Sequence, residues 1–143
     1  MDTYSFGYSS SGFTDMPMNH KVFLAQFDAI KKLASEGPCV MVGRCADYAL
    51  SEYKDCFSVF VHADTDWRIN RLSQKHNKTA KEAKDMINKT DKSRSSYYNY
   101  YTNKKWGAAS SYNLCVDSSK LGIDGAAKAI IQAVEIFDSI KNK

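Results

Sequence analysis

Three short strand-like runs constrain most strongly what this chain can fold into. They occupy residues 39–42, 57–61 and 112–116, and the first of them, Cys-Val-Met-Val, is apolar throughout. An apolar run of this length between turn residues indicates a strand covered on both faces, as in a parallel sheet. Segments with helical spacing lie before, between and after the runs. The order therefore predicts an α/β fold with a parallel sheet and right-handed crossovers.

Two long helices are expected to flank these strands. Asn19 can cap a helix that runs to about Glu36, where Gly37 and Pro38 stop it. A second helix over about 123–140 carries an apolar face wide enough to pack on a sheet. The residues before the first helix are rich in Ser, Gly and aromatic side chains without a clear period, which indicates an arm or loop.

The composition fits one globular domain. Apolar residues make up 43% and charged residues 25% of the 143 residues. The longest apolar run falls well short of the roughly 18 residues that a membrane span needs, and the chain opens without a secretion-signal pattern. The four cysteines show no C-x-x-C pairing, which argues against a metal site. Cysteines within apolar runs fit a reducing compartment, so we expect a soluble cytoplasmic protein with no membrane partner.

The positive charge of the chain is concentrated in residues 67–106. This segment holds 11 lysines and arginines against 3 acidic residues, a net charge of +8. The whole chain carries +4, so the remainder carries −4. Folding does not require such a separation of charge, which therefore indicates an anionic partner. A solvated basic helical hairpin without a ligand is the alternative.

The same segment carries strong helix signals. Arg68 and Arg71 are three residues apart and share one face of a first helix. Thr79 and Glu82 form a T-x-x-E capping box that begins a second helix, on which Asp91 and Arg94 also share a face. Two helices with arginines and a hinge between them suit a lid over phosphates. In the alternative interpretation, Asp91 and Arg94 simply form a surface ion pair at i, i+3.

Arg44 follows the first predicted strand directly, after Gly43. The carboxyl ends of strands are where open α/β sheets bind ligands, so Arg44 is a candidate for binding an anion. In the alternative interpretation it only caps a short helix over 45–51.

Three stretches of this chain resemble the cytidylate-kinase-like proteins, part of the nucleoside monophosphate kinase group. They are GPCVMVGRCADYAL, DKSRSSYYNYYT and KKWGAASSYNLCVDSSKLGID, and the likeness extends over about residues 19–142. The resemblance implies a P-loop-kinase-like three-layer parallel sheet with a helical lid, and a reaction in which ATP-Mg gives its γ-phosphoryl group to a (d)CMP-like acceptor. We expect one domain over 1–143. Residues 1–18 would form an arm or loop, residues 19–63 and 107–143 the core, and residues 64–106 the helical lid.

The resemblance also implies roles for individual residues. Arg44 matches the arginine that binds the phosphate of the acceptor, and a guanidinium suits phosphate because it binds two oxygens at once. Arg68 and Arg71 match lid arginines that contact the phosphates being exchanged. Asp91 and Arg94 match a D-x-x-R pair, with Asp91 toward the acceptor nucleoside and Arg94 toward phosphate.

Two further positions are less closely matched. Ser118 and Ser119, which follow Asp117, resemble the loop that lies against the adenine of ATP. Cytidylate kinases have an aspartate directly after the strand-end arginine, where this chain has Cys45, with Asp47 two residues on. We therefore expect Asp47 to take part in acceptor binding, with the preference for cytidine in doubt.

The largest departure is the phosphate loop. No pair of the seven glycines lies in the strand-to-helix context of G-x-x-x-x-G-K-[ST], and no protein ligand for Mg²⁺ is recognisable. The family's first strand, central in its sheet, is missing with the loop, so the chain resembles the carboxyl-terminal part of such a kinase. We expect impaired activity and either a homo-oligomer or a missing amino-terminal segment.

Two other functions remain open. One is a non-catalytic nucleotide-binding or regulatory protein that keeps the acceptor site. The other is a nucleic-acid-binding module that uses the basic segment and its tyrosines; it ranks last, because the helix needs those tyrosines for its apolar stripe.

Overall fold

The computed structural model describes residues 16–141 and divides the chain into two compact units, Met1–Ala46 and Asp47–Lys143. Most of the arm predicted over residues 1–18 lies outside the described residues. Within residues 16–141, no helix has the length and apolar character to cross a membrane.

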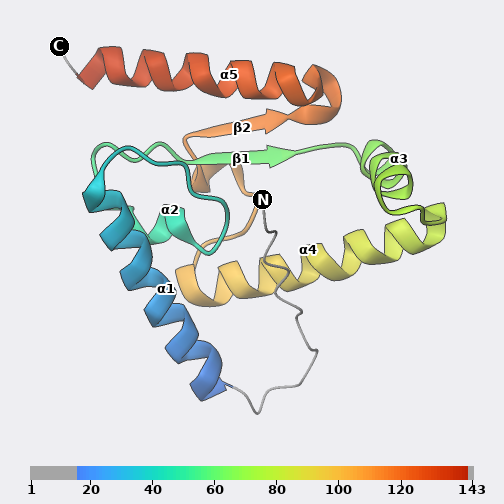
Figure 1. Ribbon diagram of the computed structural model, residues 1–143, viewed down its shortest axis with the longest axis horizontal. Helices are drawn as coiled ribbons and strands as arrows, with labels where there is room; N and C mark the ends of the chain where they lie inside the picture. Colours follow the sequence, from blue (N-terminus) through green and yellow to red (C-terminus); the bar gives the residue numbers. More distant parts are fainter. Residues whose placement is uncertain (1–15, 142–143) are drawn as a thin grey trace. The chain divides into compact units, whose positions relative to one another are not determined.

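The first unit is built on one long helix, α1 (Met16–Glu36), drawn in blue in Figure 1. It begins three residues before Asn19, so the predicted cap lies inside the helix. Its end at Glu36 is as predicted, since Gly37 follows with a φ of +148° that favours glycine. Phe23 and Ile30 form the buried side of α1, each only 8% exposed.

The prediction of a buried strand over residues 39–42 is wrong. The structure has no regular secondary structure there and no paired strand. Val40 is 95% exposed and Val42 is 90% exposed. The physical reason is that a strand becomes buried only when neighbouring strands pair with it, and the described residues supply none here.

The second unit contains a parallel pair of strands, β1 (Val59–His62) and β2 (Leu114–Asp117), in register from Val59 opposite Leu114. Both strands lie within two residues of their predicted positions. The side chain of Asn113 accepts hydrogen bonds from the backbone N–H and the hydroxyl of Ser58, each at 2.8 Å, and so joins the amino ends of the strands. The sheet has two strands among the described residues, so only part of the predicted three-layer sheet is present.

One long helix and an aromatic cluster accompany this sheet. Helix α5 (Ser118–Lys141) packs along β2 and reaches β1 (Figure 1), with the rings of Phe57 and Phe137 5.2 Å apart. Phe60, whose side chain points to the opposite face from those of its strand neighbours, lies 4.9 Å from the ring of Tyr112 and 5.2 Å from that of Trp106. Gly107 lies so close to Phe60 that a side chain there would contact the ring at 3.2 Å.

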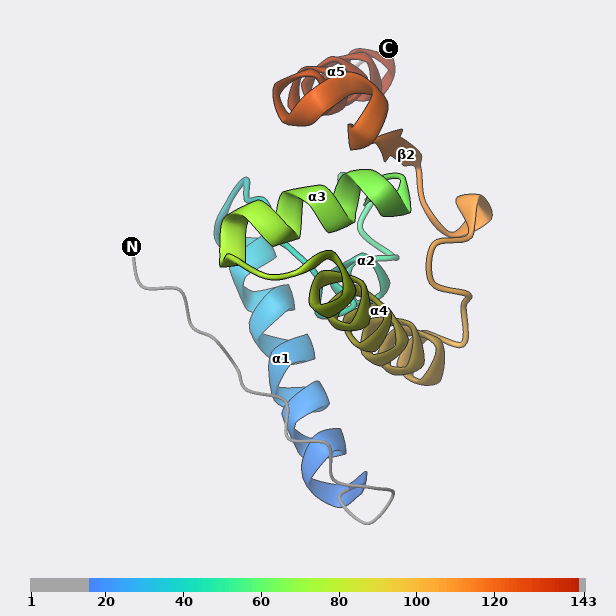
Figure 2. The same cartoon turned by 90° about the vertical axis from the view of Figure 1, so that its right-hand side faces the viewer.

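The connection from β1 to β2 contains a helical hairpin, α3 (Thr65–His76) and α4 (Ala80–Thr102), which pack against each other as Figure 2 shows. We call it the α3–α4 hairpin. Both helices lie where the sequence predicts them. The capping box is confirmed, because the Glu82 N–H donates to the Thr79 hydroxyl and the Glu82 carboxylate accepts from the Thr79 N–H. Ala83 and Ile87 form the buried side of α4.

The remaining elements are short. They are helix α2 (Ala46–Ala49), which follows the turn at Gly43, and the 3₁₀ helix η1 (Ala109–Ser111), which precedes β2.

Candidate functional site

The centre of the candidate site is an ion pair between the two helices of the α3–α4 hairpin. The guanidinium of Arg68 on α3 donates two hydrogen bonds, at 2.7 and 2.8 Å, to the two carboxylate oxygens of Asp91 on α4. The side chains are 29% and 26% exposed. The hydrogen bonds to Asp91 raise the pKa of Arg68 above its ordinary value. Two predicted site residues 23 positions apart are therefore brought together, and they bind each other.

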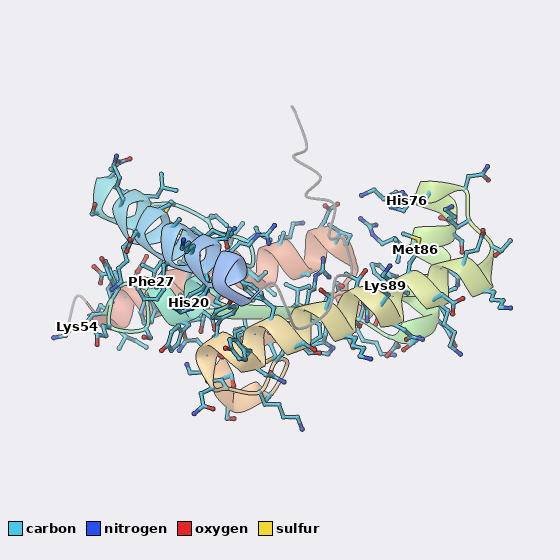
Figure 3. The ribbon with its side chains drawn as sticks, turned by 90° about the horizontal axis from the view of Figure 1, so that it is seen from below. His20, Phe27, Lys54, His76, Met86 and Lys89 are labelled. Carbon is cyan, nitrogen blue, oxygen red and sulfur yellow. The ribbon has the colours of Figure 1, made fainter. Side chains whose placement is uncertain are left out.

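The two other arginines of the hairpin are exposed. Arg71 lies over the ring of Trp67, 5.6 Å from its centre, where a cation–π contact orients the guanidinium. Arg94 forms no ion pair with Asp91 among the described residues, so the alternative of a plain surface pair on α4 does not describe them. The hairpin also carries further exposed basic residues, among them Lys89, which Figure 3 labels together with His76 and Met86.

Ser118 and Ser119 lie at the carboxyl ends of the strands. They are not on a free loop but form the first turn of α5, which has a break at Gly122 (φ +69°). The hydroxyl of Ser118 donates to the carbonyl of His62 at 3.1 Å, and the N–H of Asp64 donates to the hydroxyl of Ser119 at 3.1 Å. These bonds join the ends of the strands, so both hydroxyls contribute to structure.

The carboxylate of Asp117 is held in the same turn. It accepts hydrogen bonds from both the hydroxyl and the N–H of Ser119, and these bonds lower the pKa of Asp117. Among residues 16–141, no group of three His, Cys, Asp or Glu side chains is placed to hold a metal ion.

Asp47 occupies a different place in the second unit. Its carboxylate accepts a hydrogen bond of 2.7 Å from the hydroxyl of Tyr98, which is 5% exposed. Burial and the bond to Asp47 raise the pKa of Tyr98, and burial likewise raises the pKa of Tyr112, whose ring is stacked 6.1 Å from that of Tyr98. Asp47 also lines a cavity of about 290 Å³ together with Ser58 and Asn113.

That cavity lies at the amino ends of the strands, because Ser58 and Asn113 directly precede β1 and β2. The structure therefore separates Asp47 from Ser118 and Ser119, which lie at the carboxyl ends. Open α/β sheets bind their ligands at the carboxyl ends of the parallel strands. The role of Asp47 in acceptor binding stays a prediction.

Arg44 belongs to the first unit and is exposed. Gly43, Arg44 and Cys45 have successive positive φ angles of 72°, 56° and 56°. Residues other than glycine seldom adopt this conformation, and where they do it often marks a functional position. Beside this turn lies an apolar groove of about 260 Å³, lined by residues of α1 and of the chain from Met41 to Ala46.

Sequence reasoning missed the pairing of Arg68 with Asp91 and of Tyr98 with Asp47. The first joins residues on different helices and the second joins residues 51 positions apart. No short-range pattern reports such contacts. The one available signal for the second pair was the tyrosine run at 97–101, where a buried tyrosine needs a partner for its hydroxyl.

A family model and a solved structure match this chain. A family model described as the cytidylate kinase-like family matches residues 1–120. None of the curated proteins compared with the chain matches it. The crystal structure of an uncharacterized protein from Eubacterium ventriosum ATCC 27560 is similar, with a TM-score of 0.78 and 32% sequence identity, over 82% of this chain and 74% of that chain. Because the family model spans most of the sequence, the chain belongs to the cytidylate kinase-like family.

Proposed function

We propose that this chain acts as a nucleoside monophosphate kinase of the cytidylate type, in which ATP-Mg gives its γ-phosphoryl group to a (d)CMP-like acceptor. The Arg68–Asp91 pair carries this proposal. Phosphoryl transfer needs positioned positive charge rather than a covalent nucleophile. The Arg68–Asp91 pair links two basic helices, and the guanidinium of Arg68 can exchange its carboxylate partner for a phosphate. The pair therefore supplies that charge.

The exchange follows from geometry. A guanidinium binds carboxylate and phosphate in the same two-bond fork, so a phosphate can replace Asp91 as the partner of Arg68. The carboxylate of Asp91 is then released to accept hydrogen bonds from the acceptor nucleoside. Arg71 and Arg94 are exposed on the same hairpin and would contact the same phosphates. In this way ligand binding changes the contact between α3 and α4, which is what a lid requires.

The remaining predicted residues complete the proposal. Arg44 would bind the phosphate of the acceptor. Ser118 and Ser119 would lie against the adenine of ATP, with their backbone and first helical turn as the contacting surface, because their hydroxyls already bind protein groups. Mg²⁺, when bound with ATP, neutralises charge between the phosphates. The described residues offer no three-ligand metal site, so the nucleotide itself would have to supply most of its ligands.

A non-catalytic nucleotide-binding role is the second candidate, and the sequence gives it a specific basis. Gly7 and Gly12 have the spacing G-x-x-x-x-G of a phosphate loop, but Phe13 stands where that loop requires lysine. These residues lie outside the described part of the chain. Without the lysine, binding of the acceptor could persist while transfer is slow or absent.

A nucleic-acid-binding role is less well supported. It would need free aromatic faces beside the basic hairpin. On α4, Tyr98 is buried, and the ring of Tyr101 lies 4.8 Å from that of Tyr97 and 4.9 Å from that of Tyr100. Of these four tyrosines only Tyr100 is exposed, at 61%, and a single exposed ring is a weak basis for base stacking.

The test is calorimetric titration of CMP into the full chain and its variants, followed by an assay of CDP formation from CMP and ATP-Mg. Arg44→Ala and Arg94→Ala should each weaken CMP binding by about 2 kcal/mol, roughly thirtyfold. Lys84→Ala, an exposed charge on the same hairpin, is the matched control and should leave binding almost unchanged.

The outcomes separate the candidates. CMP binding with CDP formation supports the kinase, whereas CMP binding without CDP formation supports the non-catalytic role. Equal effects of Arg94→Ala and Lys84→Ala would show that only overall charge matters and would reject the assigned site. Binding of single-stranded RNA with a steep dependence on salt, in the absence of CMP binding, would favour the third candidate.

A further inference from the structure

Strand β1 has an unpaired edge. On one side it pairs with β2, and the carbonyl of Ser58 just before it accepts from the N–H of Leu114 at 3.1 Å. Since backbone groups of a strand alternate between its two sides, those of Val59 and Val61 face the other edge. Among the described residues no strand pairs there. Val61 is 52% exposed, so the second half of β1 is not covered in a single copy.

The same chain contains a segment with the properties of a missing neighbour. Residues 39–42 have no regular secondary structure and no backbone partner among the described residues. Val40 and Val42 are almost fully exposed, and Cys39 is exposed as well. Two nearby exposed valines on chain without backbone partners are unfavourable, because they leave both apolar surface and backbone hydrogen-bonding groups in water.

The segment and the edge match each other. Each is four residues long. Residues 39–42 carry no charge, and neither do Val59, Phe60 and Val61, so identical copies meet without repulsion at this contact. Two of the four residues in each are valines, whose β-branched side chains suit cross-strand packing. An added strand gains affinity from main-chain hydrogen bonds and specificity from alternate side chains.

We propose that two copies of this chain exchange strands, with residues 39–42 of each copy pairing with the open edge of β1 in the other. Because every copy carries both a donor segment and an acceptor edge, the exchange is reciprocal and closes at two copies. The resulting dimer enlarges each two-stranded sheet to three strands and covers Val40, Val42 and Val61. This inference goes beyond the proposed function, since it requires neither CMP nor ATP.

The first test is the oligomeric state of the full chain by sedimentation velocity over a wide concentration range. The chain is expected to be dimeric, and the double variant Val40→Asp/Val42→Asp is expected to be monomeric. Both valines are exposed in the single copy, so the variant should keep the same helical circular dichroism. Ile136→Asp, a 60% exposed apolar residue on α5, is the matched control and should remain dimeric.

The second test places the contact. A chain with Cys39→Ser and Val61→Cys is mixed with the unaltered chain, which supplies Cys39, and mild oxidation should link the two into a disulfide-bonded heterodimer. A mixture of the Cys39→Ser chain, which keeps Val61, with the unaltered chain measures the background of heterodimers formed through the other thiols, Cys45, Cys56 and Cys115.

Several outcomes would overturn the proposal. They are a wild-type chain that stays monomeric at every concentration, a dimer that survives Val40→Asp/Val42→Asp, and heterodimer formation no faster than the background. A chain carrying both Cys39 and Val61→Cys that links only within itself would show pairing inside one copy. None of these results depends on nucleotide, so they leave the kinase proposal to its own test.

Discussion

The α3–α4 hairpin and the β1–β2 sheet differ in how completely each is formed by this chain. The hairpin has a capping box at the start of α4, left-handed Asn77 and Asn103 at the ends of its helices, and the Arg68–Asp91 pair between them. The sheet has a single strand pairing, and one edge of β1 is unpaired among the described residues.

The difference follows from the range of the interactions. A helix satisfies its own backbone groups within four residues, and two consecutive helices need only a short hinge to pack together. A parallel sheet needs strands that come from distant parts of a sequence, here 55 residues apart for Val59 and Leu114. The described residues can therefore form a complete helical hairpin beside a sheet in which they supply only two strands.

The sharpest test of this comparison replaces one aliphatic side chain in each region by alanine. Ile87→Ala on α4 should lower the free energy of unfolding by about 2–4 kcal/mol, because Ile87 is 4% exposed and leaves a cavity. Val61→Ala on β1 should cost less than about 0.5 kcal/mol, because Val61 is 52% exposed. Urea denaturation measures both.

The measurement is best made in the Val40→Asp/Val42→Asp background, so that an added strand does not cover Val61. Equal losses for Ile87→Ala and Val61→Ala in that background would mean that β1 is as well packed as the hairpin. The contrast between the two regions would then be rejected.

The next prediction asks how strongly the two regions are coupled. Tyr98 on α4 donates to Asp47 and stacks on Tyr112, which precedes β2, so it links the hairpin to the sheet. Tyr98→Phe should cost about 1–2 kcal/mol of stability, since it removes a buried hydrogen bond to a charged group. Tyr100→Phe, 61% exposed, is the control and should have almost no effect.

Tyr98 also makes the free energy of unfolding depend on pH. The pKa of Tyr98 is raised in the folded chain, so the folded state holds the phenolic proton more tightly than the unfolded state. This contribution to stability is fully present below the unfolded pKa of about 10 and is lost as the pH rises above it. Tyr98→Phe should reduce the loss of stability above that pH but not abolish it, because the pKa of Tyr112 is raised as well. An unchanged alkaline slope would remove Tyr98 from this role.

Sequence reasoning succeeded where the signals are local. The capping box at Thr79, the end of α1 at Glu36 and the positions of β1 and β2 all depend on patterns a few residues long. The apolar run at 39–42 is just as local, but it reports only that the segment is suited to be a strand. Whether it is buried depends on partners elsewhere, and a pattern cannot show that those partners are present.

The candidate site was predictable in its composition but not in its contacts. Charge and spacing identified Arg68, Arg71, Asp91 and Arg94 as a group, and the structure places all four on the α3–α4 hairpin. The bond between Arg68 and Asp91 depends on how the two helices cross, which the 3.6-residue period of each helix does not determine. The hydrogen bond between Asp47 and Tyr98 could not be predicted for the same reason, because Tyr98 lies on α4, 51 residues further along the chain.

The smallest expected effect comes from the capping box, and it tests whether the hairpin opens on its own. Thr79→Ala should cost about 1 kcal/mol, since the Glu82 N–H loses its acceptor, whereas Thr79→Ser should keep most of the stability. Hydrogen bonds from the Thr79 N–H and hydroxyl lower the pKa of Glu82. Their contribution is therefore present above the ordinary glutamate pKa and fades as the pH falls below it. Thr79→Ala keeps the backbone bond, which is the larger cause, and loses only the hydroxyl bond, so the difference between the wild type and the variant should shrink only slightly in acid.

Native-state hydrogen exchange of the Thr79→Ala variant decides whether the hairpin opens separately from the sheet. Faster exchange confined to the amides of α3 and α4 would show that the hairpin opens separately from the sheet, as expected for a hairpin held by its own local contacts. The two regions meet through Tyr98, Tyr112 and Phe60, however, and these rings lie within about 6 Å of one another along the chain of contacts. If the amides of β2 and α5 lost the same protection, that aromatic contact would be strong enough to make hairpin and sheet one cooperative unit. The open edge of β1 would then be stabilised from a distance by the helices, and the hairpin could not be regarded as an independent part.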